Sequence, residues 1–210
     1  MSRVGILLSL ILCAITAPAL AELRDAYTPI TIISLSDIAD PDDYFVLSNA
    51  SPVDDARAIS LDMGGPASFA QAMESQDLHL GDELHTAIAA ALLDKKLKVI
   101  PAGGEKAHYR IDVAIPTHTA GYSDSAADSE LLPGFVVLVR VRDLRTGETR
   151  LRDRIVYGRT DIESPHTLDG DARFRFASED ALLADPKAAA DGFRVGIAAV
   201  AAEIAKIMAR

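Results

Sequence analysis

Cysteine and aromatic residues are scarce in this sequence of 210 residues. Cys13 is its one cysteine, tryptophan is absent, and there are only five tyrosines and six phenylalanines. Without further cysteines the chain has no disulfide framework and no thiolate metal site. The small number of aromatic residues argues against a base-stacking surface, so we expect no nucleic-acid partner.

Long hydrophobic runs and an excess of positive charge are also missing. The apolar run at residues 4–15 is shorter than the roughly 20 residues that cross a bilayer, so no transmembrane segment is expected in the mature chain. The 21 Lys and Arg residues against 31 Asp and Glu residues give a net charge of −10. This acidic balance disfavours nonspecific binding to nucleic acid and to anionic lipid surfaces.

The first 21 residues have the three parts of an export signal. Arg3 supplies a positive start, residues 4–15 are apolar, and Ala19-Leu20-Ala21 is a small-x-small cleavage site. We therefore expect cleavage after Ala21 and a secreted, periplasmic protein; an uncleaved anchor is the alternative. Because Leu12 rather than a small residue precedes Cys13, the sequence predicts that the mature protein is not a lipoprotein.

The most regular pattern lies between Leu78 and His118. Apolar residues recur every three or four positions from Leu80 to Leu92, which predicts an amphipathic helix. A short strand is expected at residues 97–100, followed by a Pro- and Gly-containing turn. Residues 109–115 then alternate between apolar and polar side chains, which is typical of a strand with one buried face.

Residues 134–158 predict a β-hairpin, because two alternating runs flank a short segment with a glycine. A three-residue loop, Arg145-Thr146-Gly147, with Gly147 in the left-handed conformation would close it. The expected cross-strand pairs are Val141 with Leu151, Val137 with Ile155, Arg142 with Arg150, and Arg140 with Arg152.

The last helix is expected from the N-cap Asp185 and Pro186 to about Met208, with an apolar seam that packs on the same sheet face as the first helix. The predicted fold class is α+β, with an antiparallel-rich sheet carrying two long amphipathic helices on one face. We expect one domain over residues 22–210, with a long connection at 159–185 and a mobile loop at 117–133.

Residues 22–66 have the least regular pattern. Short strands are expected at 29–35, 43–47 and 56–61, and a helical turn or two at 67–74. Acidic residues between these strands could form a calcium loop, but the glycine and terminal glutamate of an EF-hand are missing, so solvated loop acids are favoured. The acidic residues are Asp37, Asp40, Asp42, Asp43, Asp54 and Asp55.

Three segments carry a resemblance to a known kind of domain: Leu80-Gly81-Asp82-Glu83-Leu84, Ala107–Val113 and Val139–Glu148. Their order resembles the accessory domains of the bacterial cell envelope. Examples are the LptE-like and CsgG-like lipoproteins of lipopolysaccharide and curli assembly, transporter auxiliary lipoproteins, and the amino-terminal domain of TolB. The resemblance implies a periplasmic accessory or binding role and no chemistry. It does not imply membrane anchoring, because the lipobox is missing.

No catalytic or metal-binding motif is recognisable in the sequence. The five histidines have no HExxH or comparable zinc spacing, so ordinary surface histidines are the simpler interpretation. A Gly-x-Ser-x-Gly elbow and a cysteine nucleophile are both missing, and abundant carboxylates do not by themselves indicate an acid/base pair. The sequence thus predicts no enzyme, no metal and no cofactor.

The candidate binding residues are five arginines of the hairpin, here called the hairpin arginines: Arg140, Arg142, Arg150, Arg152 and Arg154. Their alternation places them opposite the apolar face, and like charges that face each other across strands are unfavourable. Water and nearby acids such as Asp112, Asp143 and Glu148 are the simpler means of neutralising them. An anionic ligand or an acidic partner surface is the functional alternative, because it would use the planar fork of arginine.

The sequence therefore favours a non-enzymatic periplasmic accessory protein that binds a periplasmic or membrane protein in envelope assembly or transport. A carrier of a small apolar or anionic ligand is the alternative, and it predicts an apolar cavity between helices and sheet. A hydrolase with dispersed carboxylates is a third hypothesis, which predicts carboxyl pKa values that are pushed apart. The pattern indicates neither the partner nor the oligomeric state.

Overall fold

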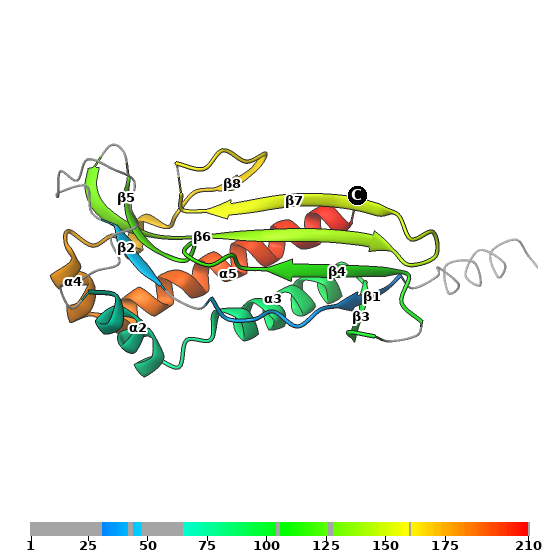
Figure 1. Cartoon of the computed structure of the whole chain (residues 1–210), viewed down its shortest axis with the longest axis horizontal. Coiled ribbons are helices and arrows are strands. Elements are labelled where there is room, and N and C mark those ends of the chain that lie inside the picture. Colours follow the sequence, from blue (N-terminus) through cyan, green and yellow to red (C-terminus); the bar gives the residue numbers. More distant parts are fainter. Residues whose placement is uncertain are drawn as a thin grey trace, which may run out of the picture. The chain divides into compact units, whose positions relative to one another are not determined.

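Eight strands form one sheet in the described part of the chain, together with four α-helices (Figure 1). The computed structural model describes residues 31–41, 44–47, 65–103, 106–125, 128–159 and 161–209. The predicted export signal at 1–21 and the predicted strand at 56–61 lie outside these residues. The strands are β1 (Ile32–Leu35), β2 (Phe45–Leu47), β3 (Lys98–Pro101), β4 (Tyr109–Ala114), β5 (Gly121–Ser125), β6 (Asp128–Asp143), β7 (Thr149–Tyr157) and β8 (His166–Leu168). The helices are α2 (Gly65–Ser75), α3 (Leu80–Asp94), α4 (Glu179–Ala184) and α5 (Pro186–Met208), with a 3₁₀ turn, η1, at Ala172–Phe174.

The long strand β6 connects the parts of the sheet. Neighbouring strands follow the order β2-β5-β6-β4-β1-β3, with β7 beside β6 and β8 beside β7. The longest pairings, those of β6 with β4, β5 and β7, are antiparallel, whereas β1 pairs in parallel with β3 and β4. The fold is thus α+β with an antiparallel-rich sheet, which confirms the predicted class. Contacts gather residues 31–210 into one compact unit.

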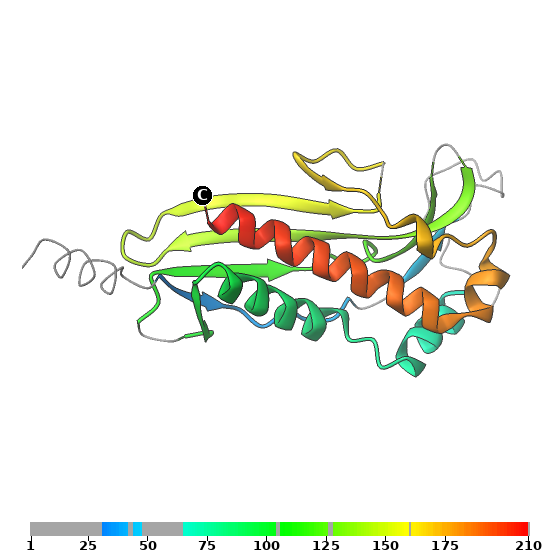
Figure 2. The same cartoon turned by 180° about the vertical axis from the view of Figure 1, so that it is seen from behind.

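The two long helices, α3 and α5, lie side by side on the same face of the sheet (Figure 2), as predicted. Aromatic rings fill the space between α5 and the strands. The Phe193 ring centroid lies 5.5 Å from that of Tyr122 and 6.3 Å from that of Phe135. Gly196 lets α5 approach closely, because a Cβ atom there would lie 2.5 Å from the Tyr157 ring.

Side-chain caps determine where both long helices begin. Asp185 accepts a hydrogen bond from the Ala188 N–H at 3.0 Å and Pro186 opens the helix, as predicted. The cap of α3 comes from a distant segment, since the Asp40 carboxylate accepts the Gly81 N–H at 2.5 Å. Asp40 is one of the acids predicted to be solvated, and it is exposed, but it also fixes the start of a helix.

The hairpin of β6 and β7 has most of the predicted register. Val141 pairs with Leu151, Val137 with Ile155, and Arg140 with Arg152, as expected. The pairing of Arg142 with Arg150 was wrong, because a β-bulge after Val141 sets Arg142 against Thr149. Gly147 is left-handed with φ +78°, as predicted.

The loop of this hairpin is one residue longer than predicted. The Gly147 N–H donates to the Asp143 carbonyl, and the Asp143 N–H donates to the Glu148 carbonyl, so that residues 144–147 form the loop. The Asp143 carboxylate accepts the N–H groups of Arg145 and Thr146 at 2.9 and 3.2 Å. These bonds hold Leu144 in the turn, since an aspartate that accepts backbone N–H groups further along the chain mimics a turn.

Several other segments are more regular than the sequence suggested. The mobile loop expected at 117–133 was wrong, because β5 and the first part of β6 form there. Strand pairing and the burial of Tyr122 stabilise this region despite its small polar side chains. Helix α2 is longer than the predicted turn or two, and the connection at 159–185 contains β8, η1 and α4. No described helix combines the length and hydropathy needed to cross a membrane.

Candidate functional site

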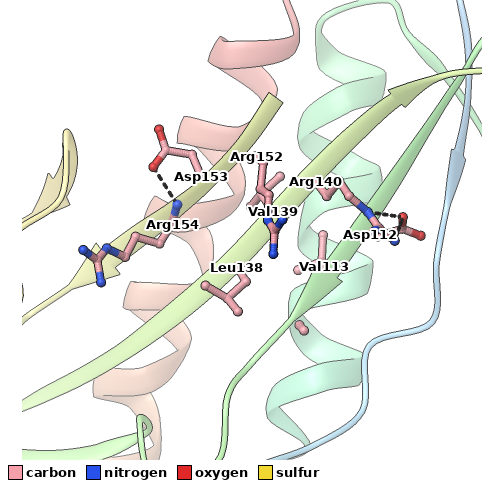
Figure 3. Close-up of a pocket in the computed structure, with 9 residues that line it drawn as sticks. Asp112, Val113, Leu138, Val139, Arg140, Arg152, Asp153 and Arg154 are labelled. Carbon is pink, nitrogen blue, oxygen red and sulfur yellow. Dashed lines mark hydrogen bonds and ion pairs between the residues drawn. The ribbon is translucent and has the colours of Figure 1, made fainter. Parts of the chain in front are cut away.

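The sheet face opposite α3 and α5 is rich in arginine. Register places its side chains in three rows across β4, β6 and β7. The rows are Ala114–Leu138–Arg154, then Asp112–Arg140–Arg152, then Arg110–Arg142–Thr149. Figure 3 labels Leu138 and Arg154 of the first row and all three residues of the second. We call the five arginines of these rows the arginine face: Arg110, Arg140, Arg142, Arg152 and Arg154.

Asp112 is the acidic residue in these rows, and it lies between two arginines. Its carboxylate is 2.5 Å from Arg110 Nε and 2.8 Å from Arg140 Nη2. Burial would raise the pKa of Asp112, but the hydrogen bonds from Arg140 and Arg110 outweigh it and hold the pKa below its ordinary value. The Asp112 charge is therefore already used within the sheet.

The other three arginines of the face have no such counter-charge. Among the described residues, no carboxylate lies within ion-pair distance of Arg142, Arg152 or Arg154. Arg140 and Arg152 face each other directly across β6 and β7, and Arg110 faces Arg142 across β4 and β6. Like charges in this position destabilise a sheet, so the arrangement favours the binding of an anion.

Arg150 is the one hairpin arginine that the structure separates from the others. It is the extra residue of the β-bulge, and its Nη2 lies 3.2 Å from the buried Asp143 carboxylate. Burial raises the pKa of Asp143, but hydrogen bonds from Thr146, Arg150 and Arg145 outweigh it and lower the pKa. Arg150 thus stabilises the hairpin turn, as the simpler interpretation held.

A shallow hollow of about 530 Å³ lies over the first two rows (Figure 3). Leu138 and Ala114 form its apolar floor, and Leu138 is 45% exposed. Asp112, Arg140, Arg152 and Arg154 surround that floor. The hollow therefore offers an exposed apolar contact surrounded by guanidinium groups, a combination suited to an acidic chain with some apolar side chains.

A second hollow, of about 540 Å³, lies along α3 and α5. Arg194 spans it, with its Nε 3.2 Å from the Glu83 carboxylate and its Nη1 3.2 Å from Asp191. These bonds join the two helices. Because its charges pair with each other, this groove is better explained as helix packing than as a binding site.

The described residues contain no group of three or more His, Cys, Asp or Glu side chains that could hold a metal ion. His166 has two carboxylate neighbours: its Nδ1 lies 3.2 Å from Glu203 and its Nε2 lies 3.5 Å from Asp153. This cluster ties β8 and β7 to α5. We therefore interpret this cluster as a structural contact that positions β8 and not as a catalytic group.

Sequence reasoning missed two members of the site. Arg110 alternates with apolar residues in β4, and this pattern placed it on a polar face without showing that β4 lies beside β6. Leu138 interrupts the arginine pattern in β6. The sequence did contain a signal for Leu138. It is an apolar residue on a strand face where the next two side chains, Arg140 and Arg142, are charged.

No protein-family model matches the chain, and no curated protein matches it. A DUF330 protein of Xanthomonas campestris is similar in structure, with 12% identity, coverage of 83% of this chain and 80% of that one, and a TM-score of 0.44. A proposed lipoprotein of Caulobacter crescentus has 16% identity, coverage of 62% and 80%, and a TM-score of 0.33. The resemblance to particular assembly lipoproteins, transporter auxiliary lipoproteins and the TolB domain stays a prediction.

Proposed function

We propose that this chain is a non-enzymatic binding protein of the bacterial cell envelope that recognises an acidic surface of a protein partner through its arginine face. One observation carries the proposal. On the sheet face opposite α3 and α5, which also carries exposed Leu138, Arg152 and Arg154 are exposed and Arg142 is half-buried, and none of the three arginines has a carboxylate partner among the described residues. A partner that supplies carboxylates would relieve the repulsion between facing arginines and cover the leucine.

The distribution of charge supports this interpretation. The whole chain has a net charge of −10, yet this face gathers five arginines around Asp112. A positive patch on an acidic protein steers an acidic partner to one orientation, because the rest of the surface repels it.

The carrier hypothesis has less support. A carrier of an apolar ligand needs an enclosed apolar cavity, whereas both hollows described above lie open on the surface. Between sheet and helices, Phe69, Phe135 and Phe193 are fully buried; the Phe135 ring packs against Phe193, and the Phe69 ring packs against Tyr122. A small anion held on the arginine face is the other form of the carrier hypothesis, and the experiment below distinguishes it.

The pKa directions favour a binding role over hydrolysis. A general acid requires a carboxyl whose pKa is raised towards neutrality. Where the pKa of a described carboxyl group shifts, neighbouring cations or N–H groups lower it. These groups are Asp112, Asp143, Asp161, Asp171, Asp191 and Glu203. These carboxylates act as counter-charges.

Crosslinking of the protein in living cells, followed by mass spectrometry, tests the proposal. The test variant is Arg152→Glu with Arg154→Glu, because neither arginine forms an ion pair with any residue that the structure describes. The control is Lys95→Glu with Lys96→Glu, two exposed residues after α3 that give the same change in net charge. We expect one discrete envelope protein to be captured by the wild type and the control, and at least tenfold less by the test variant.

Capture that is equal in both variants would refute the arginine face as the binding surface. If no protein is captured, native mass spectrometry of the purified protein should reveal a co-purified anion, and that result would favour the carrier. The intact mass of the periplasmic protein tests the location, since cleavage after Ala21 leaves Glu22 as the first residue.

A further inference from the structure

One edge of the sheet is left open beside the arginine face. Strand β7 has nine residues, but β8 pairs only with Ile155, Val156 and Tyr157. Figure 1 shows β7 continuing well beyond the short β8. Among the described residues, no strand pairs with the outer edge of residues 149–153.

The backbone along this edge points outward at defined positions. The Arg154 carbonyl accepts a hydrogen bond from Ser164 Oγ at 2.6 Å, so it points away from β6 and towards the segment that leads to β8. In an antiparallel pair the N–H and C=O groups of one residue point to the same side, and this direction repeats every second residue. The N–H and C=O of Arg152 therefore also face outward, where they can bond to another strand.

The charges of the edge determine what can pair with it. An exposed edge strand is a template for any extended chain, including the same strand of a second copy. Two β7 edges would bring Arg152 and Arg154 of one copy close to the same arginines of the other, and such like-charge pairs are unfavourable. The edge thus opposes self-pairing, while the same arginines attract an acidic strand.

We infer that the acidic partner contributes an extended strand that adds to the open edge of β7. This inference rests on the proposed function and specifies its mode of recognition. The added strand would lengthen the second row, placing a carboxylate opposite Arg152 and within reach of Arg154. Main-chain hydrogen bonds to Arg152 give affinity, and the carboxylates give specificity.

The opposite face of the edge specifies the alternate side chains of the added strand. Leu151 points to the helix side, where it is half-buried and packs against the core, as do Ile207 and Met208 at the end of α5. A residue that pairs with Leu151 would meet this apolar surface. The pattern of the strand is thus acidic and apolar in alternation, over about five residues or roughly 17 Å.

Binding of synthetic peptides to the mature protein tests this inference by calorimetry. The probe is an acetylated and amidated peptide, Thr-Glu-Val-Glu-Val-Glu-Thr. One control replaces its glutamates with lysines. Two further controls keep the acidic sequence but carry N-methyl groups on alternate residues, one on each alternate set, so that one of them blocks the N–H groups that face β7. We expect the acidic peptide to bind, the lysine peptide not to bind, and one N-methylated peptide to bind at least tenfold more weakly.

A pair of protein variants gives the same test from the other side. Arg152→Ala removes the charge. Arg152→Pro removes both the charge and the outward N–H, and an edge strand tolerates proline. We expect the proline variant to bind the peptide at least fivefold more weakly than the alanine variant. If the proline variant does not fold, hydrogen exchange of the Arg152 amide serves instead. It should slow at least tenfold in the wild-type protein when the peptide is bound.

The outcomes separate this inference from the proposed function. Equal binding of the acidic peptide and both N-methylated peptides, with no slowing of the Arg152 amide, would refute strand addition and leave charge recognition intact. An acidic peptide that fails to bind, while an acidic protein is captured through Arg152 and Arg154, would also refute strand addition alone. Binding to anionic phosphatidylglycerol vesicles but to no acidic peptide would overturn both proposals.

Discussion

The two faces of the sheet differ sharply although they belong to the same strands. Towards α3 and α5, the residues Phe135, Val137, Val139 and Val141 of β6 are buried, at 3% exposure or less. Towards the open side, the intervening residues Leu138 and Arg140 are exposed, whereas Val136 is buried. One face is closed by the chain's own helices, and the other presents charges that the fold balances only in part.

This difference separates stability from binding. Burial of apolar area stabilises the fold, at about 25 cal/mol per Å² of apolar area removed from water. An exposed charged face contributes little to stability, because surface ion pairs are typically worth about 0–1 kcal/mol. Substitutions on the helix side should therefore unfold the protein, whereas those on the open side should change its interactions.

Phe193→Ala should have the largest effect on stability. Its ring is fully buried among other aromatic rings, so the cavity should lower the free energy of unfolding by about 3–5 kcal/mol. Leu138→Ala on the open face is the matched control, for which we expect a change within about 0.5 kcal/mol. Urea denaturation of both variants measures the difference, and similar losses would contradict the contrast between the faces.

Gly196→Ala tests the same contrast, because helix propensity and packing against the sheet predict opposite changes in the free energy of unfolding. Helix propensity alone predicts that alanine stabilises α5 by about 1 kcal/mol. The added Cβ would lie 2.5 Å from the Tyr157 ring and 2.7 Å from the Phe135 ring, so we expect a loss of about 1–3 kcal/mol instead. Thermal unfolding tests this. The control variant is Ala202→Gly, at an exposed position of α5, which measures the effect of helix propensity alone. A stabilised Gly196→Ala variant would show that the helix can move away from the sheet.

Asp112→Asn tests the one carboxylate in the three rows. We expect a loss of about 1 kcal/mol at neutral pH, since two arginines lose their counter-charge. The folded pKa of Asp112 is lowered, so this contribution is present above the ordinary carboxyl value of 3.8 and is lost as the pH falls through the folded pKa. The gap between wild type and variant in urea midpoint should thus close in acid. The control is Asp169→Asn at an exposed site, and a gap that is constant with pH would contradict the assignment.

Arg152→Gln should have the smallest effect on stability. It removes the repulsion with Arg140 across β6 and β7, so the free energy of unfolding should stay the same or rise by up to about 0.5 kcal/mol. Partner capture should nevertheless fall at least threefold. A variant that is clearly less stable would mean that Arg152 supports the fold and not an interaction.

Local patterns in the sequence predicted the elements and much of the hairpin. Alternation along β6 and β7 fixed the pairs Val141–Leu151 and Val137–Ile155, because a slip of one residue would expose every apolar side chain. Asp185 and Pro186 correctly predicted the start of α5. These signals succeed because each depends on neighbours within a few residues.

Only the tertiary structure decided how distant segments meet. Pairing of β4 with β6 brought Arg110 and Asp112 onto the arginine face, and the bulge at Arg150 directed that side chain to Asp143. Asp40 caps a helix that begins about 40 residues later. Even β5, with its small polar residues, forms a strand because β6 and β2 lie on either side of it. The sequence alone determined which residues are buried or charged, but long-range contacts determined which charges lie together, because those depend on the packing of the whole sheet.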